Sequence, residues 1–248
     1  MLFSELKEYL DFKSVQYNTR DFIETDPIQI PHRFNQKEDI EIIAFLVSTI
    51  AWGKRAMIIK SSERLLDIMQ HSPFDFIQNY EENSNLEFVH RTFNGIDLDF
   101  FFRSLQNIYQ NGGLEKAFSL HPEIDGVKGR IMTFRELFLE TEHEKRSEKH
   151  ISNPMKNSAT KRINMFLRWM VRKDNKGVDF GIWKSIPSSE LYLPLDVHTS
   201  RISRELGLLS RKQDDWKALE ELMQKLREMD ANDPVKYDFA LFGIGVFE

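Results

Sequence analysis

Residues 193–208, Leu-Pro-Leu-Asp-Val-His-Thr-Ser-Arg-Ile-Ser-Arg-Glu-Leu-Gly-Leu, contain the signals that start and stop a short helix. Asp196 occupies the N-cap position, where its carboxylate can accept hydrogen bonds from the free amides of the first turn. Gly207 occupies the C-terminal stop, where the chain enters the left-handed region. We therefore predict a helix over residues 197–206 that begins at a carboxylate.

A second helix start lies upstream, in the stretch NPMKNSATKRINMFLRWMVR over residues 153–172. Pro154 and the pair Asn157-Ser158 form a turn that feeds a helix predicted over 158–173, whose apolar side chains recur at three-to-four spacing. The free amides of its first turn form an anion site of the kind that a backbone phosphate fills. The basic side chains nearest this site are those of Lys156, Lys161 and Arg162.

The rest of the chain is also helical in pattern. Residues 37–52, KEDIEIIAFLVSTIAW, have apolar side chains at helical spacing. These side chains would cover most of the circumference of a helix, which predicts that the helix is mostly buried. No stretch alternates with period two and no internal repeat is present, so the fold class is all-α. Further helices are predicted over residues 55–70, 73–80, 97–110, 131–139, 214–229 and 234–246.

Two features divide the chain. Asp26-Pro27 and Ile30-Pro31 cannot continue a helix, so residues 1–36 are expected to form an extended lead-in that packs on the C-terminal lobe. Residues 140–150 contain no apolar side chain to bury, and we place the main seam of the protein there. The expected organisation is the lead-in 1–36, a helical lobe over 37–145 and a hairpin-containing helical lobe with a basic surface over 146–248.

Composition narrows the class of protein. Of 248 residues, 41% are hydrophobic and 29% charged, with 11 Gly and 8 Pro, which favours a compact helical protein. The absence of cysteine excludes disulfides, thiolate-bound zinc and thiolate-bound iron–sulfur clusters. No HExxH arrangement includes any of the 7 histidines, and no Gly-rich phosphate loop is present, so we expect neither a metal nor a nucleotide cofactor. Without a signal peptide or a run of about 18 apolar residues, we expect a cytoplasmic protein with no membrane partner.

The charges are unevenly distributed. Overall, 34 basic side chains face 39 acidic ones, for a net charge of −5. Residues 151–212 alone hold 12 basic and 5 acidic side chains, a net charge of +7, while the remainder carries −12. A basic region within an acidic body indicates a footprint for phosphate. The alternative interpretation is that residues 151–212 form solvent-exposed helix faces that are rich in Lys and Arg without binding phosphate.

Lys161 and Asp196 are the candidate chemical groups. The positive end of the helix dipole and the neighbouring Arg162 both disfavour an ammonium at Lys161, and a neutral amine is a nucleophile. In the simpler interpretation, Asp196 is a structural N-cap and Lys161 is one more exposed lysine.

The sequence Pro194-Leu-Asp196-Val-His198-Thr-Ser-Arg201, followed by Glu-Leu-Gly-Leu, resembles the Pro-Val-Asp-Thr-His-Val-x-Arg…Arg-Leu-Gly-Leu signature of the helix–hairpin–helix (HhH-GPD) DNA glycosylases. In that superfamily the Asp is catalytic, and bifunctional members carry a Lys in the preceding hairpin. The resemblance therefore implies that Asp196 and Lys161 are catalytic, between the two lobes of a helical glycosylase fold. The chain is also similar to a bacterial family without an assigned function.

The hairpin region departs from the superfamily pattern. The usual hairpin reads Leu-Pro-Gly-Val-Gly, whereas the turn here, Pro154-Met-Lys-Asn-Ser158, contains no glycine. Lys161 and Asp196 are separated by 35 residues, with an insertion over 175–183. The archaeal 8-oxoguanine glycosylase branch is similar in having a lengthened hairpin region.

The resemblance implies a base-excision repair glycosylase, with or without AP-lyase activity, that acts as a monomer on double-stranded DNA carrying a damaged, flipped base. It also implies a base pocket and a set of DNA contacts, although the residues alone favour core packing for the aromatic candidates. A catalytically silent nucleic-acid-binding protein of the same fold and a helical interaction protein are the rival functions. The implied pocket residues are Trp52, Asp238 and Phe242, and the implied DNA contacts are Lys156, Asn157, Ser158, Arg162, His198 and Arg201.

Overall fold

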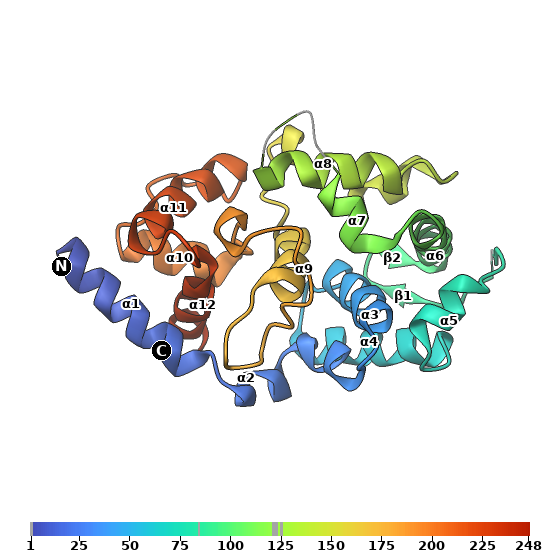
Figure 1. The fold of residues 1–248 in the computed structure, drawn as a ribbon, viewed down its shortest axis with the longest axis horizontal. Coiled ribbons are helices and arrows are strands. Elements are labelled where there is room, and N and C mark those ends of the chain that lie inside the picture. The colour runs from blue at the N-terminus through green and yellow to red at the C-terminus, as the bar shows by residue number, and fades with distance from the viewer. Residues whose placement is uncertain (1, 84, 121–123, 125) are drawn as a thin grey trace. The chain divides into compact units, whose positions relative to one another are not determined.

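The computed structural model describes residues 2–83, 85–120, 124 and 126–248, and shows a predominantly helical chain (Figure 1). The chain divides into two compact units. Unit 1 comprises Met1–Glu24 and Asn153–Glu248, and unit 2 comprises Thr25–Ser152. Among the described residues, no helix is both long enough and apolar enough to cross a bilayer.

Unit 2 is built mainly from helices packed around aromatic side chains. Phe45 lies in the predicted buried helix, and its ring contacts those of Phe101, Phe134 and Phe138 at centroid distances of 6.0, 5.5 and 5.5 Å. The described elements are η1 (Pro27–Gln29), η2 (Pro31–Arg33), α3 (Lys37–Thr49), α4 (Arg55–Ile68), α5 (Pro73–Gln78), β1 (Val89–His90), β2 (Phe93–Asn94), α6 (Gly95–Gln110), α7 (Gly113–Ser119), α8 (Gly126–Phe138) and η3 (Lys145–His150).

The short hairpin of β1 and β2 was not predicted from the sequence. Its strands are antiparallel, with Val89 opposite Asn94 and His90 opposite Phe93. Two-residue strands are too short to show an alternating pattern. The following helix also needs a glycine at its start, because a Cβ on Gly95 would lie 1.8 Å from the carbonyl oxygen of Leu86.

Residues 145–150, within the predicted seam, are fixed to unit 2 by one buried carboxylate. Asp97 Oδ1 accepts hydrogen bonds from Arg146 Nη1 at 2.9 Å and Ser147 Oγ at 2.6 Å. Asp97 Oδ2 lies 3.3 Å from His150 Nε2. This run has no apolar side chain to bury, yet its polar side chains are held in the unit, and the boundary falls after Ser152.

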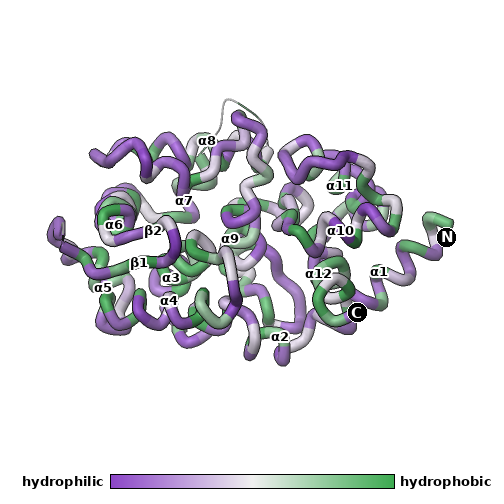
Figure 2. Tube along the Cα trace, turned by 180° about the vertical axis from the view of Figure 1, so that it is seen from behind, coloured by the Kyte–Doolittle hydropathy of each residue, from purple (hydrophilic) through white to green (hydrophobic). Residues whose placement is uncertain are grey.

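Unit 1 is organised around α12, where hydrophobic residues recur along the trace in Figure 2. Helices α1 and α10 both pack on α12. The ring of Tyr17 passes so near α12 that a Cβ on Gly243 would lie 2.1 Å from it, so only glycine fits there. The elements are α1 (Phe3–Tyr17), α2 (Arg20–Thr25), which ends in unit 2, η4 (Pro154–Lys156), α9 (Lys161–Val171), η5 (Ser188–Glu190), α10 (Val197–Glu205), α11 (Trp216–Met229), η6 (Pro234–Lys236) and α12 (Tyr237–Phe247).

The expected extended lead-in over residues 1–36 is wrong for most of its length. Its first part forms α1, because Leu6, Leu10 and Ser14 recur every four residues and are buried along one side of the helix. The prolines that suggested an extended chain begin the 3₁₀ turns η1 and η2, where a missing amide is tolerated. The lead-in also divides between the units, with 1–24 in unit 1 and 25–36 in unit 2.

Candidate active site

The loop before α9 turns at a left-handed residue that is not glycine. Asn157 takes the left-handed conformation at φ 63°, which asparagine tolerates better than most residues. Its side-chain Nδ2 donates to Asp215 Oδ2 at 2.7 Å, and its carbonyl accepts from the amide of Trp216 at 3.1 Å. The loop is therefore fastened to the start of α11 by Asn157.

Helix α9 begins at Lys161 without a side-chain cap. The N-cap residue, Thr160, has φ 45° and accepts no hydrogen bond from the first turn. Its hydroxyl is buried and has no hydrogen-bond partner among the described residues. The start of α9 therefore lacks the capping side chain that helix starts usually have, and an anion bound there can serve as an acceptor.

Helix α10 begins as the sequence predicted, with Asp196 as its N-cap. Asp196 Oδ1 accepts hydrogen bonds from the amides of His198 and Thr199, each at 2.9 Å. Gly207 follows the helix at φ 72°, as a C-terminal stop requires. The two backbone amides thus hold Oδ1, and these hydrogen bonds fix the direction in which Oδ2 points.

Asp196 Oδ2, the other oxygen, faces the amine of Lys161. The distance from Lys161 Nζ to Asp196 Oδ2 is 3.5 Å, although 35 residues separate them in the chain. The Lys161 side chain is 37% exposed and that of Asp196 is 12% exposed. The fold of unit 1 therefore brings an accessible amine and a mostly buried carboxylate together at the starts of two helices.

Further along α9, two buried arginines lie at helical positions that share a side with Lys161. Arg168 and Arg172 follow it by 7 and 11 residues, close to two and three turns. Arg168 Nε lies 3.2 Å from Asp179 Oδ1, and Arg168 Nη1 pairs with Asp238 Oδ2. Arg172 pairs with three carboxylates, of which Asp179 is shared with Arg168. We call this set the acid–arginine network: Arg168, Arg172, Asp174, Asp179, Asp233 and Asp238.

The acid–arginine network holds four carboxylates against two guanidinium groups, which favours a proton on one of the acids. Burial raises the pKa of Asp238 to about 7; the negative charges of Asp196 and Asp179 add to the rise, while Arg168 opposes it. Burial also raises the pKa of Asp233, against the attraction of Arg172. Asp238 is therefore a second, deeply buried acid whose charge is coupled to that of Asp196.

A family model described as "Protein of unknown function (DUF2400)" matches residues 26–247. The chain belongs to the DUF2400 family. No curated protein and no solved structure matches it. The match to the DUF2400 model includes Lys161, Asp196 and the whole acid–arginine network, whereas α1 lies outside it.

His198 and Arg201 of this DUF2400 protein contact α12. His198 Nδ1 lies 3.1 Å from the carbonyl oxygen of Gly245, to which Arg201 Nη2 also donates at 3.1 Å. The His198 ring meets that of Phe242 edge-on at 6.2 Å, and Phe242 is partly exposed. These contacts tie α10 to α12, and no interaction of either side chain with Asp196 is seen in the described structure.

The other predicted site residues lie in different surroundings. Trp52 belongs to unit 2, where its ring stacks on His150 at 6.0 Å and meets His90 edge-on at 5.1 Å. Asp238 is 4% exposed and pairs with Arg168, so its accessible surface for a base edge is small. Burial lowers the pKa of Arg162 to about 10. Lys156 is exposed, and Asn157 and Ser158 are partly exposed beside it.

Sequence reasoning missed the acid–arginine network because it counted Arg168 and Arg172 as surface charge. Arg168 lies on α9 among buried residues and Arg172 is the C-cap of that helix, and their spacing from Lys161 was the signal available. Their partners are 70 and 61 residues away at Asp238 and Asp233, which no local pattern shows. Fewer basic side chains are therefore left to bind phosphate than the count of basic residues in the sequence suggests. Six of the 12 basic side chains of 151–212 form ion pairs within unit 1: Lys161, Arg168, Arg172, Arg201, Arg204 and Arg211.

In the part of the chain that the structure describes, no three His, Asp or Glu side chains gather as a group that could hold a metal ion. The chemistry open to the Lys161–Asp196 pair is that of an amine and a carboxylate. An amine so placed can attack an electrophilic carbon, and the carboxylate can take up its proton or stabilise nearby positive charge.

Proposed function

We propose that this protein is a DNA base-excision glycosylase with AP-lyase activity, in which Lys161 is the nucleophile and Asp196 the catalytic carboxylate. The observation that carries the proposal is the 3.5 Å approach of Lys161 Nζ to Asp196 Oδ2, with the lysine side chain partly exposed and the carboxylate direction fixed by α10. The resemblance of residues 194–208 to the HhH-GPD signature supports it, because the signature selects Asp196, and bifunctional members of that superfamily carry a lysine in the preceding hairpin, where Lys161 lies.

The proposed reaction begins with the neutral amine of Lys161, after Asp196 Oδ2 has taken its proton. The amine attacks C1′ of the sugar, the bond from C1′ to the base breaks, and the base leaves with the bonding electrons. Asp196 gives its proton to the departing base and is again a carboxylate. The carboxylate stabilises the positive charge that develops on the sugar. The nitrogen then loses a proton to Asp196, which passes it to the ring oxygen as the C1′–O4′ bond breaks, giving a protonated imine between Lys161 and C1′. Loss of a proton from C2′ to Asp196 or water breaks the C3′–O bond, and the 3′ phosphate leaves with the bonding electrons.

Phosphate binding is assigned to the loop before α9 and the start of that helix. A DNA phosphate there would accept from the first-turn amides, which lack a side-chain cap, and would lie near exposed Lys156. Double-stranded DNA hides C1′ and the base from such a site, so the target nucleotide must be flipped out, at a cost of a few kcal/mol.

Borohydride trapping on a duplex with an abasic site tests the proposal, because this substrate needs no knowledge of the lesion. Borohydride reduces the imine to a stable amine, so the wild type should become covalently joined to DNA. We expect trapping to fall about 1,000-fold or more in Lys161→Gln. Lys173→Gln, which removes another exposed lysine of unit 1, should trap as the wild type does.

A panel of duplexes with oxidised, alkylated and deaminated bases then tests the glycosylase step. Excision without trapping would show that water is the nucleophile, leaving Asp196 as the catalytic group. Salt-dependent binding with neither excision nor trapping on any duplex would replace the enzyme with a nucleic-acid-binding protein. Trapping that persists in Lys161→Gln would refute the assignment of the nucleophile.

A further inference from the structure

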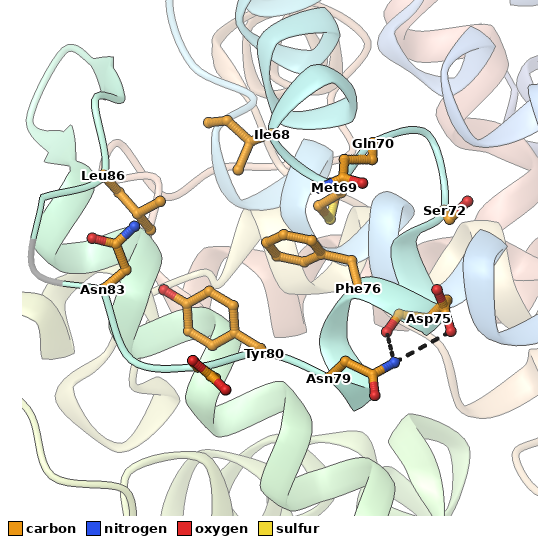
Figure 3. A pocket seen from close by; sticks show the side chains of 11 residues that line it. Ile68, Met69, Gln70, Ser72, Asp75, Phe76, Asn79, Tyr80, Asn83 and Leu86 are labelled. Atoms are coloured by element: carbon orange, nitrogen blue, oxygen red, sulfur yellow. Dashed lines mark hydrogen bonds between the residues drawn. The ribbon is translucent and has the colours of Figure 1, made fainter.

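Unit 2 contains a cavity of about 490 Å³ that plays no part in the proposed reaction. It lies between the end of α4, helix α5 and the residues Tyr80, Glu81, Asn83 and Leu86, as Figure 3 shows. Apolar surface is supplied by Met69, Phe76, Tyr80 and Leu86. Its volume is within the range of small-molecule sites, about 300–1,000 Å³.

Hydrogen bonds to a neighbouring helix hold one wall of the cavity. Asp99 Oδ1, on α6, accepts from Tyr80 Oη and from the amide of Asn83, each at 2.8 Å. Arg103 Nε donates to Asp99 Oδ2 at 2.8 Å and fixes this carboxylate in turn. Gln106 Nε2 donates to the carbonyl of Tyr80 at 3.0 Å. The cavity wall is therefore formed before any ligand arrives.

The polar groups around the cavity favour a positive charge. Asp75 and Glu81 are exposed at its rim, and no Lys or Arg is among the described residues that line it. Helix α4 ends at Ile68, so the negative end of its dipole faces the same space. Phosphate and other anions would be repelled here, in contrast to the loop before α9.

Aromatic rings favour the same kind of ligand. The rings of Phe76 and Tyr80 lie 5.4 Å apart, tilted by 45°, and both line the cavity (Figure 3). Ring faces attract ammonium and guanidinium groups, and they also provide apolar area for a flat ligand body. The carboxylates, the helix end and the aromatic rings therefore all favour one class of ligand, a cation with an apolar body.

We propose that this cavity binds an organic cation: an ammonium or guanidinium group carried on a compact apolar body. The charged group lies at the rim between Asp75 and Glu81, and the apolar body lies against Phe76 and Leu86. A free amine and a basic side chain of another protein share this chemistry. The site is independent of the proposed glycosylase activity.

Titration of the full-length protein with phenethylammonium, followed by calorimetry or ligand-detected NMR, tests the proposal. We expect saturable binding with a Kd below about 10 mM. 2-Phenylethanol, which has the same shape and no charge, should bind at least about fivefold more weakly. A capped lysine dipeptide serves as the second arm, and tighter binding of this dipeptide would identify a protein side chain as the source.

Variants locate the site. Asp75→Asn and Glu81→Gln should each weaken phenethylammonium binding about fivefold, while Glu82→Gln, an exposed neighbour outside the cavity, should leave it unchanged. Phe76→Leu should weaken binding of both the charged and the neutral probe. Equal affinity for the charged and neutral probes, unchanged binding in the double variant of Asp75 and Glu81, or no saturation with either cation would overturn the proposal.

Discussion

Asp97 in unit 2 and Asp196 in unit 1 are both carboxylates at the start of a helix, and their surroundings differ. Asp97 has no exposed side-chain surface and is contacted by Asn94, Arg146, Ser147 and His150. Burial opposes its ionisation, but the nearby His150 ring and the hydrogen bonds from Ser147 and the amide of Asn94 outweigh burial and lower the pKa of Asp97 to about 2.

Asp196 has one oxygen engaged by backbone amides and the other facing an exposed lysine at 3.5 Å. A carboxylate whose oxygens are both occupied by buried protein groups can only hold structure together. A carboxylate with one oxygen directed at an accessible amine retains capacity for chemistry. This difference separates a structural acid from a candidate catalytic one, although both would look alike as helix caps in sequence.

The largest effect on stability is expected for Asp97→Asn. The change leaves the guanidinium of Arg146 and the buried His150 without their carboxylate, and loss of one partner of a buried pair costs about 3–5 kcal/mol. Urea unfolding should show this loss at neutral pH. Trapping of DNA by the protein that remains folded should be unchanged, and a selective loss of trapping would remove the distinction between the two acids.

Asp238→Asn should change how stability depends on pH. With a pKa raised from 3.8 to about 7, folded Asp238 keeps a proton that the unfolded chain has lost. The free energy of unfolding of the wild type should therefore fall, relative to the variant, as pH rises from about 4 to about 7, by at most about 4 kcal/mol. Above that range the difference should be constant. Urea unfolding across this range measures the free energy of unfolding of both proteins. Parallel curves of this free energy against pH for the wild type and Asp238→Asn would show that the pKa of Asp238 is not raised in the folded protein.

Asp196→Asn should separate catalysis from capping. The asparagine oxygen can still accept from the amides of His198 and Thr199, and Asn and Asp are comparable N-caps, so the unfolding free energy should change by less than about 0.5 kcal/mol. Trapping on an abasic duplex should slow about 100- to 1,000-fold, or about 3 kcal/mol of activation free energy. If Asp196→Asn slowed trapping and also lowered the free energy of unfolding, the role of Asp196 would be purely structural.

Local sequence patterns predicted the parts of the site that depend on local signals. The cap at Asp196, the stop at Gly207 and the buried helix near Phe45 each follow from neighbours within a few residues. Helix α1 was missed because prolines outside it were given too much weight. The hairpin of β1 and β2 and the short helix α7 carry too few residues for a periodic pattern.

The pairing of Lys161 with Asp196 came from a resemblance. The spacing of Arg168 and Arg172 from Lys161 was a signal for the acid–arginine network, but the distant carboxylates that pair with them could not be read from local patterns. Whether Arg168 is a surface charge or a buried ion pair depends on Asp179 and Asp238, which reach it only in the folded chain. The sign of a residue's charge is visible in sequence, but its burial and its partners are set by tertiary packing.

The smallest expected effect concerns Lys156, an exposed side chain at the end of η4. Each lysine that contacts a DNA phosphate releases about one counterion, so Lys156→Gln should reduce the slope of log affinity against log salt by about 0.9. Lys149→Gln is a matched control, since Lys149 is also exposed near the end of a 3₁₀ helix, η3 of unit 2. Fluorescence anisotropy over a salt series measures both slopes. Equal reductions would show that DNA contacts the region around Asp97 as closely as the loop before α9, and the basic segment would then not mark the binding surface.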